Sequence, residues 1–534
     1  TRDVNLIDQG LELVRSLDNE SLYQKLLKGI EYKVFKSKTW SGEEQEEGRL
    51  VANSTFTGSG PAQPYLNYAM RGLINNAPND FVQKLRSEVK ELKIDFFGDI
   101  SNFVNLERLD MSYNGAGKQT ISYLKEFSVF EKLTSLSIHG EFIHTDQDLK
   151  GFLNLKGLTH LKLSISLLSS GKNALPLKTL VGMENCSELQ ELSIDGCAKL
   201  IDVEGINGCQ KLKSIELSEA KRLENLNGLK GLKSLKSINI NDAEALDNLD
   251  GLKGCDSLEE IKIDGSNYSG NKKIKQPIKN VDGLIGLKKL KDLNLSSFNS
   301  LKNVDGLKGC SDLSYLNISS DSLENINGLK NLKALRGIQL DTVKLNNIDG
   351  LSGCENLDDF NIQSKDIKNL NGLKGCDKLQ ELNIPSSAKS LNLDGLASMN
   401  SLRVVNFRDC EIKSFDFTQK IPPITYADIK SSNQIKSLEG IGNLINLEKI
   451  IIKDCTNLEN LKGIENIKTL ESVIIQDCKS LKDVKALLSL PKLKVFKMRS
   501  CGIKKEELPG HLKVIVETTI SHMDEDSYSF RDKK

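Results

Sequence analysis

Histidine and cysteine are the residues of this 534-residue chain whose types could support catalysis or metal binding, and it has 5 histidines and 11 cysteines. The histidines are His139, His144, His160, His511 and His522. Only His139 and His144 are close in sequence, and no cysteine or paired carboxylate joins them at the spacing of metal ligands. The chain also lacks a glycine-rich phosphate loop and a Gly-x-Ser-x-Gly motif. We therefore predict no catalytic residues, no metal and no cofactor, and a protein that is not an enzyme.

The cysteines recur in register with a repeated pattern. One set, four residues after a recurring glycine, is Cys186, Cys209, Cys255, Cys310, Cys354 and Cys376. A second set, three residues after the last apolar position of a short motif, is Cys197, Cys410, Cys455, Cys478 and Cys501. The odd total argues against a complete disulfide framework. Because both sets keep a fixed place in the repeat, they are expected to be buried packing residues that stay reduced, which favours a cytoplasmic location.

The repeat itself is clearest between Gly306 and Gly395. The glycines followed by leucine are Gly306, Gly328, Gly350, Gly372 and Gly395, at spacings of 22, 22, 22 and 23 residues. Each unit then continues with Leu-x-x-Leu-x-Leu, as in Leu335, Ile338 and Leu340. The Leu-x-Leu portion is typical of a short strand with apolar side chains on one face. No single unit can bury that face alone, so stacked units are expected to form a solenoid with parallel strands.

The pattern resembles the short leucine-rich repeats of the internalins and of phosphatase-regulator proteins, in which an Ile-x-x-Ile-x-Gly-Leu segment joins units. The segments 325–329 (NINGL) and 347–351 (NIDGL) carry that resemblance, which extends over roughly four-fifths of the chain. It implies an α/β solenoid, a curved leucine-rich-repeat array with a parallel β-sheet on the concave face. Counting the Leu-x-x-Leu-x-Leu frames from Val89 to a degenerate frame at Leu512 gives about 19 repeats. The resemblance also implies that the second set of cysteines fills the Asn/Cys slot of the consensus.

Three regions are expected along the chain. Residues 1–85 are predicted to be a mainly helical N-terminal cap, with helices over 1 to about 35 and 64–76 and a loop or weak hairpin between them. Residues 86–515 are predicted to be the solenoid. Residues 516–534 lack an apolar period and are expected to form a tail. A polar, basic insertion at 266–276 is either a binding loop or a tolerated surface loop.

Composition limits the classes of partner. Lysine plus arginine and aspartate plus glutamate both total 73, so no net charge favours nucleic acid or an anionic membrane. No apolar stretch approaches the length of a transmembrane helix. The first twenty residues lack the apolar stretch of a secretory signal. We therefore expect a protein partner, without nucleic acid or membrane.

The concave face is expected to present the residues between the apolar strand positions. The middle positions form a series of amides that ends in a carboxylate: Asn294, Asn317, Gln339, Asn361, Asn383, Asn406 and Asp428. Stacked amides can hydrogen-bond along the sheet, so a structural role is favoured over binding. Acidic flanking residues lie in the middle of the array, at Glu260, Asp292, Asp359 and Glu381.

Toward the C-terminus the same face becomes basic and partly apolar. The candidate partner-binding residues there are Arg408, Tyr426, Lys430, Lys449, Ile451, Lys453, Ile474, Lys497 and Arg499. An exposed isoleucine pair beside a tyrosine, ringed by basic residues, has the composition of a protein-binding hot spot. The competing interpretation is that a C-terminal segment covers those isoleucines.

These features predict a non-catalytic scaffold or adaptor that binds a protein through its concave face. A regulatory subunit that recruits or inhibits an enzyme is the first alternative, and a secreted or surface adhesin of internalin type is the second. The in-register thiols speak against the adhesin.

Overall fold

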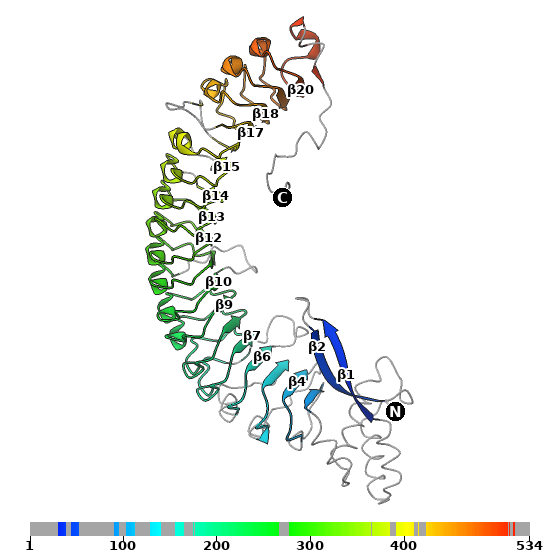
Figure 1. Ribbon diagram of the computed structural model, residues 1–534, viewed down its shortest axis with the longest axis vertical. Helices are drawn as coiled ribbons and strands as arrows, with labels where there is room; N and C mark the ends of the chain where they lie inside the picture. The colour runs from blue at the N-terminus through cyan, green and yellow to red at the C-terminus, as the bar shows by residue number, and fades with distance from the viewer. Residues whose placement is uncertain are drawn as a thin grey trace, which may run out of the picture. The chain divides into compact units, whose positions relative to one another are not determined.

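The protein's structure is a computed structural model that describes residues 30–38, 44–52, 90–94, 103–112, 129–139, 155–164, 175, 177–265, 277–364, 366–384, 391–410, 415, 423–510, 512 and 516–517. The chain divides into two compact units, Thr1–Asn241 and Asp242–Lys534. Within each unit the described strands lie on one side of the coils (Figure 1).

The first unit begins with an antiparallel pair of strands, β1 (Ile30–Lys38) and β2 (Glu44–Ala52). The predicted hairpin is therefore present, but the prediction of helix as far as residue 35 is wrong for residues 30–35. Ile30, Tyr32 and Val34 alternate with charged residues, and this period of two is that of a strand. The rest of the predicted helical cap lies outside the described residues.

The first unit continues with parallel strands in sequence order, each hydrogen-bonded to the next. They are β3 (Glu91–Ile94), β4 (Arg108–Ser112), β5 (Ser135–His139), β6 (His160–Ser164), β7 (Glu191–Ile194), β8 (Ser214–Leu217) and β9 (Ser237–Ile240). One described 3-10 helix, η4 (Asn227–Leu229), lies between β8 and β9.

The second unit repeats the same coil of strand and 3-10 turn. Its strands are β10 (Glu260–Asp264), β11 (Asp292–Ser296), β12 (Tyr315–Ser320), β13 (Gly337–Thr342), β14 (Asp359–Gln363), β15 (Glu381–Ile384), β16 (Val404–Arg408), β17 (Tyr426–Lys430), β18 (Lys449–Lys453), β19 (Ser472–Gln476), β20 (Val495–Arg499) and β21 (Val516–Glu517). Strands β10 to β14 run in order in one parallel sheet, and β15 to β21 run in order in another.

The 3-10 helices of the second unit lie on the side opposite the strands (Figure 1). They are η5 (Asp250–Leu252), η6 (Asp282–Leu284), η7 (Asp305–Leu307), η8 (Asn327–Leu329), η9 (Asp349–Leu351), η10 (Asn371–Leu373), η11 (Asp394–Ser398), η12 (Ile441–Asn443), η13 (Ile464–Asn466), η14 (Lys485–Ser489) and η15 (Lys505–Glu507).

The core is the column of apolar side chains inside the coils. In the unit that follows Gly328, Leu335, Ile338, Leu340 and Ile348 are each at most 1% exposed. Each such burial removes a side chain from water at a gain of about 1.5–3 kcal/mol. The predicted assignment of these repeat positions to a shared core is confirmed.

The repeated Asn-x-Asx-Gly-Leu segment builds the turn. The Oδ1 atoms of Asn325 and Asn347 accept backbone N–H groups two residues later, at 3.3 and 3.2 Å. At Gly350 an added Cβ would collide with the Ile326 carbonyl of the preceding coil. Glycine is therefore required there by the close approach of two backbones.

The cysteines fill the core between coils. Ten of the 11 are buried, Cys501 is half-buried, and no disulfide joins any of these described residues. Burial raises the pKa of the Cys354 thiol to about 11 and that of Cys376 to about 12. The prediction of buried packing thiols is confirmed.

The fold is thus a parallel-strand solenoid of about 14 turns. The predicted count of about 19 repeats is not confirmed, because for β3 to β6 much of the return segment lies outside the described residues. The insertion at 266–276 and residues 518–534 also lie outside them.

Candidate functional site

The side chains between the buried strand positions form what we call the open face of each sheet, which corresponds to the predicted concave face. From β10 to β15 the middle position of this face is exposed or half-exposed. These residues are Lys262, Asn294, Asn317, Gln339, Asn361 and Asn383. Parallel pairing holds Asn294, Asn317, Gln339 and Asn361 in line across β11 to β14.

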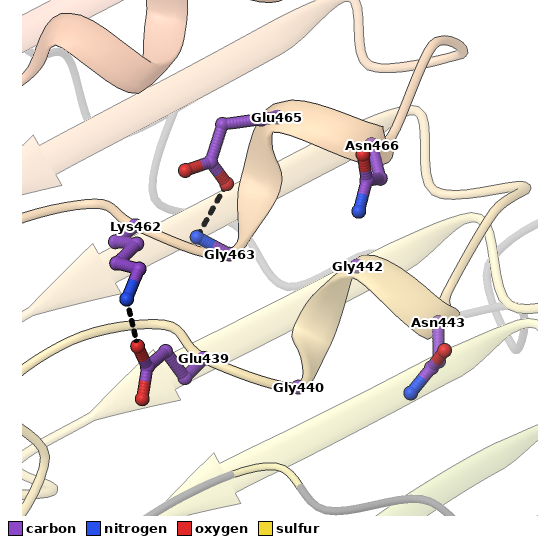
Figure 2. A pocket seen from close by; sticks show the side chains of 8 residues that line it. All are labelled: Glu439, Gly440, Gly442, Asn443, Lys462, Gly463, Glu465 and Asn466. Atoms are coloured by element: carbon purple, nitrogen blue, oxygen red, sulfur yellow. Dashed lines mark hydrogen bonds and ion pairs between the residues drawn. The ribbon is translucent and has the colours of Figure 1, made fainter.

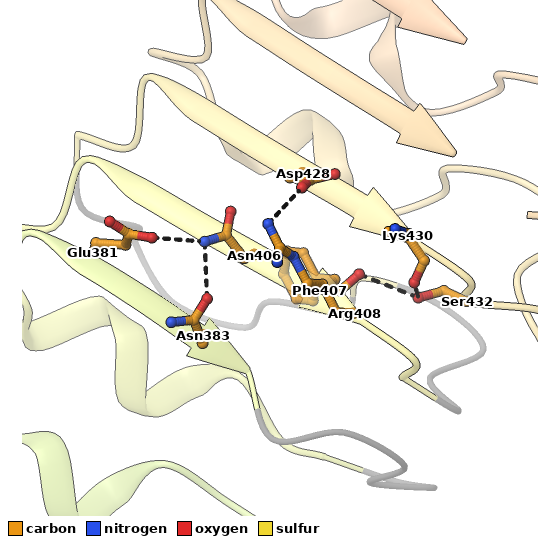
Figure 3. Close-up of polar contacts among 8 residues, drawn as sticks. All are labelled: Glu381, Asn383, Asn406, Phe407, Arg408, Asp428, Lys430 and Ser432. Atoms are coloured by element: carbon orange, nitrogen blue, oxygen red, sulfur yellow. Dashed lines mark hydrogen bonds and ion pairs between the residues drawn. The ribbon is translucent and has the colours of Figure 1, made fainter. Parts of the chain in front are cut away.

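The predicted amide ladder is only partly present. The Asn406 amide donates to Asn383 Oδ1 and to Glu381 Oε1, both at 2.9 Å (Figure 3). No hydrogen bond joins Asn294, Asn317 and Asn361 to neighbouring amides within the described part of the chain, so the structural interpretation is wrong for these three. The amides of Asn317 and Asn361 remain available to a partner, whereas Asn294 Oδ1 is buried and accepts no hydrogen bond from any described residue.

An aromatic platform lies in the same area and was missed from the sequence. The Tyr315 ring lies over Gly337, where an added Cβ would be only 2.6 Å from its Cδ2 atom. The Tyr315 hydroxyl donates to Gln339 Oε1 at 3.4 Å, and the ring is half-exposed. A glycine in a strand interior, one repeat after a tyrosine at the same position, was the signal that could have revealed it.

Carboxylates flank this platform. In register across β11 to β14 the order is Asp292, Tyr315, Gly337 and Asp359. Desolvation raises the pKa of Asp292, and nearby Lys262 opposes that shift. We call this surface the central strip: Asp292, Asn294, Tyr315, Asn317, Gln339, Asp359, Asn361 and Asn383.

The predicted C-terminal hot spot is not an exposed apolar surface. Tyr426, Ile451 and Ile474 are 3%, 1% and 2% exposed, and with Val404 they form one buried cluster. The expectation of an exposed isoleucine pair is therefore wrong. These four side chains bury one another on the open face, and Lys430, Lys449 and Lys453 flank them in register.

Basic side chains surround this cluster, as the sequence predicts. Arg408, Lys430 and Arg499 are exposed, and Lys449, Lys453 and Lys497 are half-exposed. The Lys449 Nζ atom lies 5.7 Å from the centre of the Tyr426 ring, within cation–π range. Burial, reinforced by the charge of Asp428, raises the pKa of Tyr426. We call the cluster and its basic rim the C-terminal patch.

Two polar side chains at the edge of the patch are also buried. Asn406 and Asp428 are 1% and 7% exposed. Arg408 donates to Asp428 Oδ2 at 3.2 Å, as Figure 3 shows. The other oxygen of each residue, Asn406 Oδ1 and Asp428 Oδ1, is buried and accepts no hydrogen bond from any residue that the structure describes.

His139, the histidine considered above as a possible metal ligand with His144, lies on the open face of the first unit. His139 Nε2 is 2.8 Å from Ser137 Oγ and 3.8 Å from Asp110 Oδ1, while Nδ1 contacts Ser164 Oγ at 2.5 Å. Because Asp110 and Ser137 share one ring nitrogen, this geometry is not that of an ordered Ser-His-Asp relay. His144 lies outside the described residues, so the possible His139–His144 pair is untested.

A shallow pocket lies on the turn side of the second unit (Figure 2). Its lining residues are Glu439, Gly440, Gly442, Asn443, Lys462, Gly463, Glu465 and Asn466. Lys462 Nζ donates to Glu439 Oε1 at 2.5 Å, and the Gly463 N–H donates to Glu465 Oε2 at 2.5 Å. The charged side chains of the pocket thus form hydrogen bonds within the repeats themselves. The lining includes no serine, threonine or cysteine that could act as a nucleophile.

No cluster of three or more metal-ligating side chains occurs among the described residues. No helix in the described part of the chain is long and apolar enough to cross a membrane.

Comparison with known families settles the repeat type. The model of the BspA type leucine-rich repeat region, in 6 copies, matches residues 182–305, 285–403 and 400–524. The chain belongs to the BspA-type leucine-rich repeat family. Both the central strip and the C-terminal patch lie within these BspA-type repeats.

Two solved structures show a weak similarity to the chain. An internalin from Listeria monocytogenes is 17% identical, with a TM-score of 0.38, covering 76% of this chain and 94% of its own. A leucine-rich-repeat protein from Leptospira interrogans is 14% identical, with a TM-score of 0.37, covering 80% of this chain and 94% of its own. No curated protein sequence matches the chain.

Proposed function

We propose that this protein is a non-catalytic scaffold that binds another protein through the open face of its repeats, with the central strip as the contact surface. The observation that supports this proposal most is the pair of accessible amides, Asn317 and Asn361, whose hydrogen-bonding groups are not used along the sheet. A fixed tyrosine ring beside that pair supplies the aromatic area that protein interfaces favour.

The chemistry of the strip indicates the kind of partner. Asp292 and Asp359 flank the amides, so a partner surface bearing lysine or arginine would be complementary. The strands are fixed by parallel pairing and by a buried core, so binding requires little ordering of this surface.

The test compares retention of one partner by three forms of the full chain. Wild-type protein captures partners from a native lysate, and the affinity of the main partner is then measured with purified components. We expect Asp292→Lys combined with Asp359→Lys to weaken binding by about tenfold or more. Ile445→Ala is the matched control, because Ile445 is 58% exposed in the loop after η12 and lies off the strip. Equal affinity in all three forms would exclude the strip as the contact surface.

The finer roles are distinguished by what the partner is. A co-purifying enzyme whose rate changes on binding supports a regulatory subunit, and a host surface protein supports an internalin-like adhesin. We propose a cytoplasmic location, which the buried thiols without disulfides support. The C-terminal patch remains a second proposed contact surface, through the basic side chains of its rim.

A further inference from the structure

Two tyrosines hold the same position in their repeats but have different neighbours. Tyr315 begins β12 and Tyr426 begins β17. The residue in register with Tyr426 on the next strand is Lys449, whose Nζ atom lies 5.7 Å from the centre of the ring, within cation–π range. The residue in register with Tyr315 on the next strand is Gly337. The chain therefore supplies a cation beside one tyrosine and a glycine beside the other.

The Tyr315 ring is held in place by the glycine and by a hydrogen bond. An added Cβ at Gly337 would lie 2.6 Å from Cδ2 and 3.0 Å from Cε2, so one edge of the ring fills the space of a side chain there. Gly337 is buried, although its strand position belongs to the open face. The Tyr315 hydroxyl donates to Gln339 Oε1 at 3.4 Å. Tyr315 itself is half-exposed, so part of a ring in a fixed orientation is accessible from solution.

Carboxylates lie on both sides of this ring. Asp292 is in register with Tyr315 on β11, and Asp359 lies on β14, two strands beyond Tyr315. Both carboxylates belong to half-exposed residues. Partial burial raises the pKa of Asp292, because it removes water that would solvate the charged form. Lys262, the basic side chain that opposes this shift, forms an ion pair with Glu260. A further cation beside Asp292 is therefore favoured.

The two carboxylates act on the same point. Strands β11 and β14 are three strand separations apart, or about 14 Å. A cation against the Tyr315 ring therefore lies within about 10 Å of each carboxylate, the distance over which charges interact at about 0.1 M salt. The negative charges and the ring face thus favour the same kind of ligand, a group with positive charge.

We propose that Tyr315, Gly337, Asp292 and Asp359 form a binding site for the guanidinium group of an arginine side chain on the partner protein. We call these four residues the guanidinium site. The proposal rests on the proposed function of the central strip as a contact surface, and adds the side chain that the partner places there. It extends to a second protein the kind of contact that Tyr426 makes with Lys449 within this chain.

Among cationic groups, guanidinium fits the chemistry of the site best. Its planar face stacks on an aromatic ring, and its N–H groups form paired hydrogen bonds with carboxylates such as Asp292 and Asp359. The ammonium group of lysine is more strongly hydrated and has no planar face to stack. A trimethylated lysine has no N–H group for the carboxylates and is recognised by cages of aromatic rings, whereas the central strip contains one ring.

Fluorescence anisotropy with labelled peptides tests the proposal on the full chain. Three peptides have the same length and charge and differ only in carrying arginine, lysine or Nε-trimethyllysine. We expect the arginine peptide to bind wild-type protein about threefold or more tighter than either of the others. The measured quantity is this ratio of affinities. Because the ratio does not change with the fraction of folded protein, it separates the site from effects on stability.

Variants locate the preference within the chain. Tyr315→Leu should lower the ratio to about one, whereas Tyr315→Phe, which keeps the ring, should retain it. Gly337→Ala should also lower the ratio, because the new Cβ displaces the ring while every charge is kept. Gly510→Ala is the matched control, since an added Cβ there has no neighbour within 4 Å. Asp292→Asn combined with Asp359→Asn should weaken binding of all three peptides by about threefold or more.

Three outcomes overturn the proposal. Equal affinity of wild-type protein for the arginine and lysine peptides would remove the guanidinium preference. Tighter binding of the trimethyllysine peptide would assign the ring to a methylated lysine. An unchanged ratio in Tyr315→Leu would place the arginine elsewhere on the chain.

The native partner tests the proposed function separately. If the guanidinium preference is absent while partner binding still depends on Asp292 and Asp359, the guanidinium site alone is refuted. If the preference is present while partner binding does not depend on those carboxylates, the site stands and the proposed function of the strip is refuted.

Discussion

Because the buried thiols are protonated in the folded protein, the free energy of unfolding of this solenoid should fall at alkaline pH. The Cys354 thiol has an ordinary pKa of 9.0 and is held at about 11 by burial. Folding therefore favours the protonated thiol, and this stabilisation is complete below pH 9 and is lost as pH rises through 11. At pH 10 the loss for this one thiol is about 1.4 kcal/mol, from one pH unit above the unfolded pKa and one below the folded pKa.

The assay is urea-induced unfolding of wild type and Cys354→Ala at pH 7 and pH 10 under reducing conditions, followed by circular dichroism. The free energy of unfolding of the variant lies below that of wild type at pH 7, and the difference should shrink by about 1.4 kcal/mol at pH 10. Ser320→Ala is the control, because Ser320 is buried and its hydroxyl, which donates to Leu301 O at 2.9 Å, does not titrate in this range. A constant Cys354→Ala difference across the two pH values would refute the buried protonated thiol.

Three further outcomes test the backbone and thiol chemistry of the repeat. Gly372→Ala should lower the free energy of unfolding by about 3 kcal/mol, since the new Cβ would collide with the Ile348 backbone. Gly375→Ala, with φ of +87° and no neighbour within 4 Å, should cost only about 1–2 kcal/mol; equal losses would contradict the close approach at Gly372. Asn347→Ala should cost about 1 kcal/mol through loss of the 3.2 Å bond to the Asp349 N–H, measured by the same urea titration, and no loss would show the bond to be dispensable. Iodoacetamide at pH 8 should leave native Cys376 unmodified, because its pKa of about 12 keeps it protonated; rapid alkylation detected by mass spectrometry would show the packing to be wrong.

Periodicity was sufficient to predict the strands of the solenoid. Each Leu-x-x-Leu-x-Leu frame reports a local constraint that recurs in every coil, so a frame at Leu335 correctly places β13 at Gly337–Thr342. The N-terminal region offers no such recurrence. There the helical prediction extended into Ile30–Phe35, where alternation of apolar and charged side chains favours a strand.

The binding face could be predicted less well, for a physical reason. Strand alternation tells which side chains leave the core, and it placed Asn383, Asn406 and Ile451 correctly on the open face. It does not tell how closely neighbouring side chains pack over a position, and the exposures of Asn383 and Asn406 differ although their residue type and register are the same. Exposure of a repeat surface thus depends on the packing of the side chains around each position.

That distinction also explains why the isoleucines occur where they do. A solvated position in a stacked array tolerates an amide, whereas Ile451 and Ile474 avoid leaving apolar area in water because they pack with Val404 and Tyr426 in one buried cluster. Basic residues ring this cluster. The sequence of the open face therefore matches two different environments, an accessible central strip and a C-terminal patch whose apolar side chains are buried within a basic rim. Variants of the strip and variants of the buried cluster should consequently act independently, the first on partner binding and the second on stability, since the residues concerned lie on different strands.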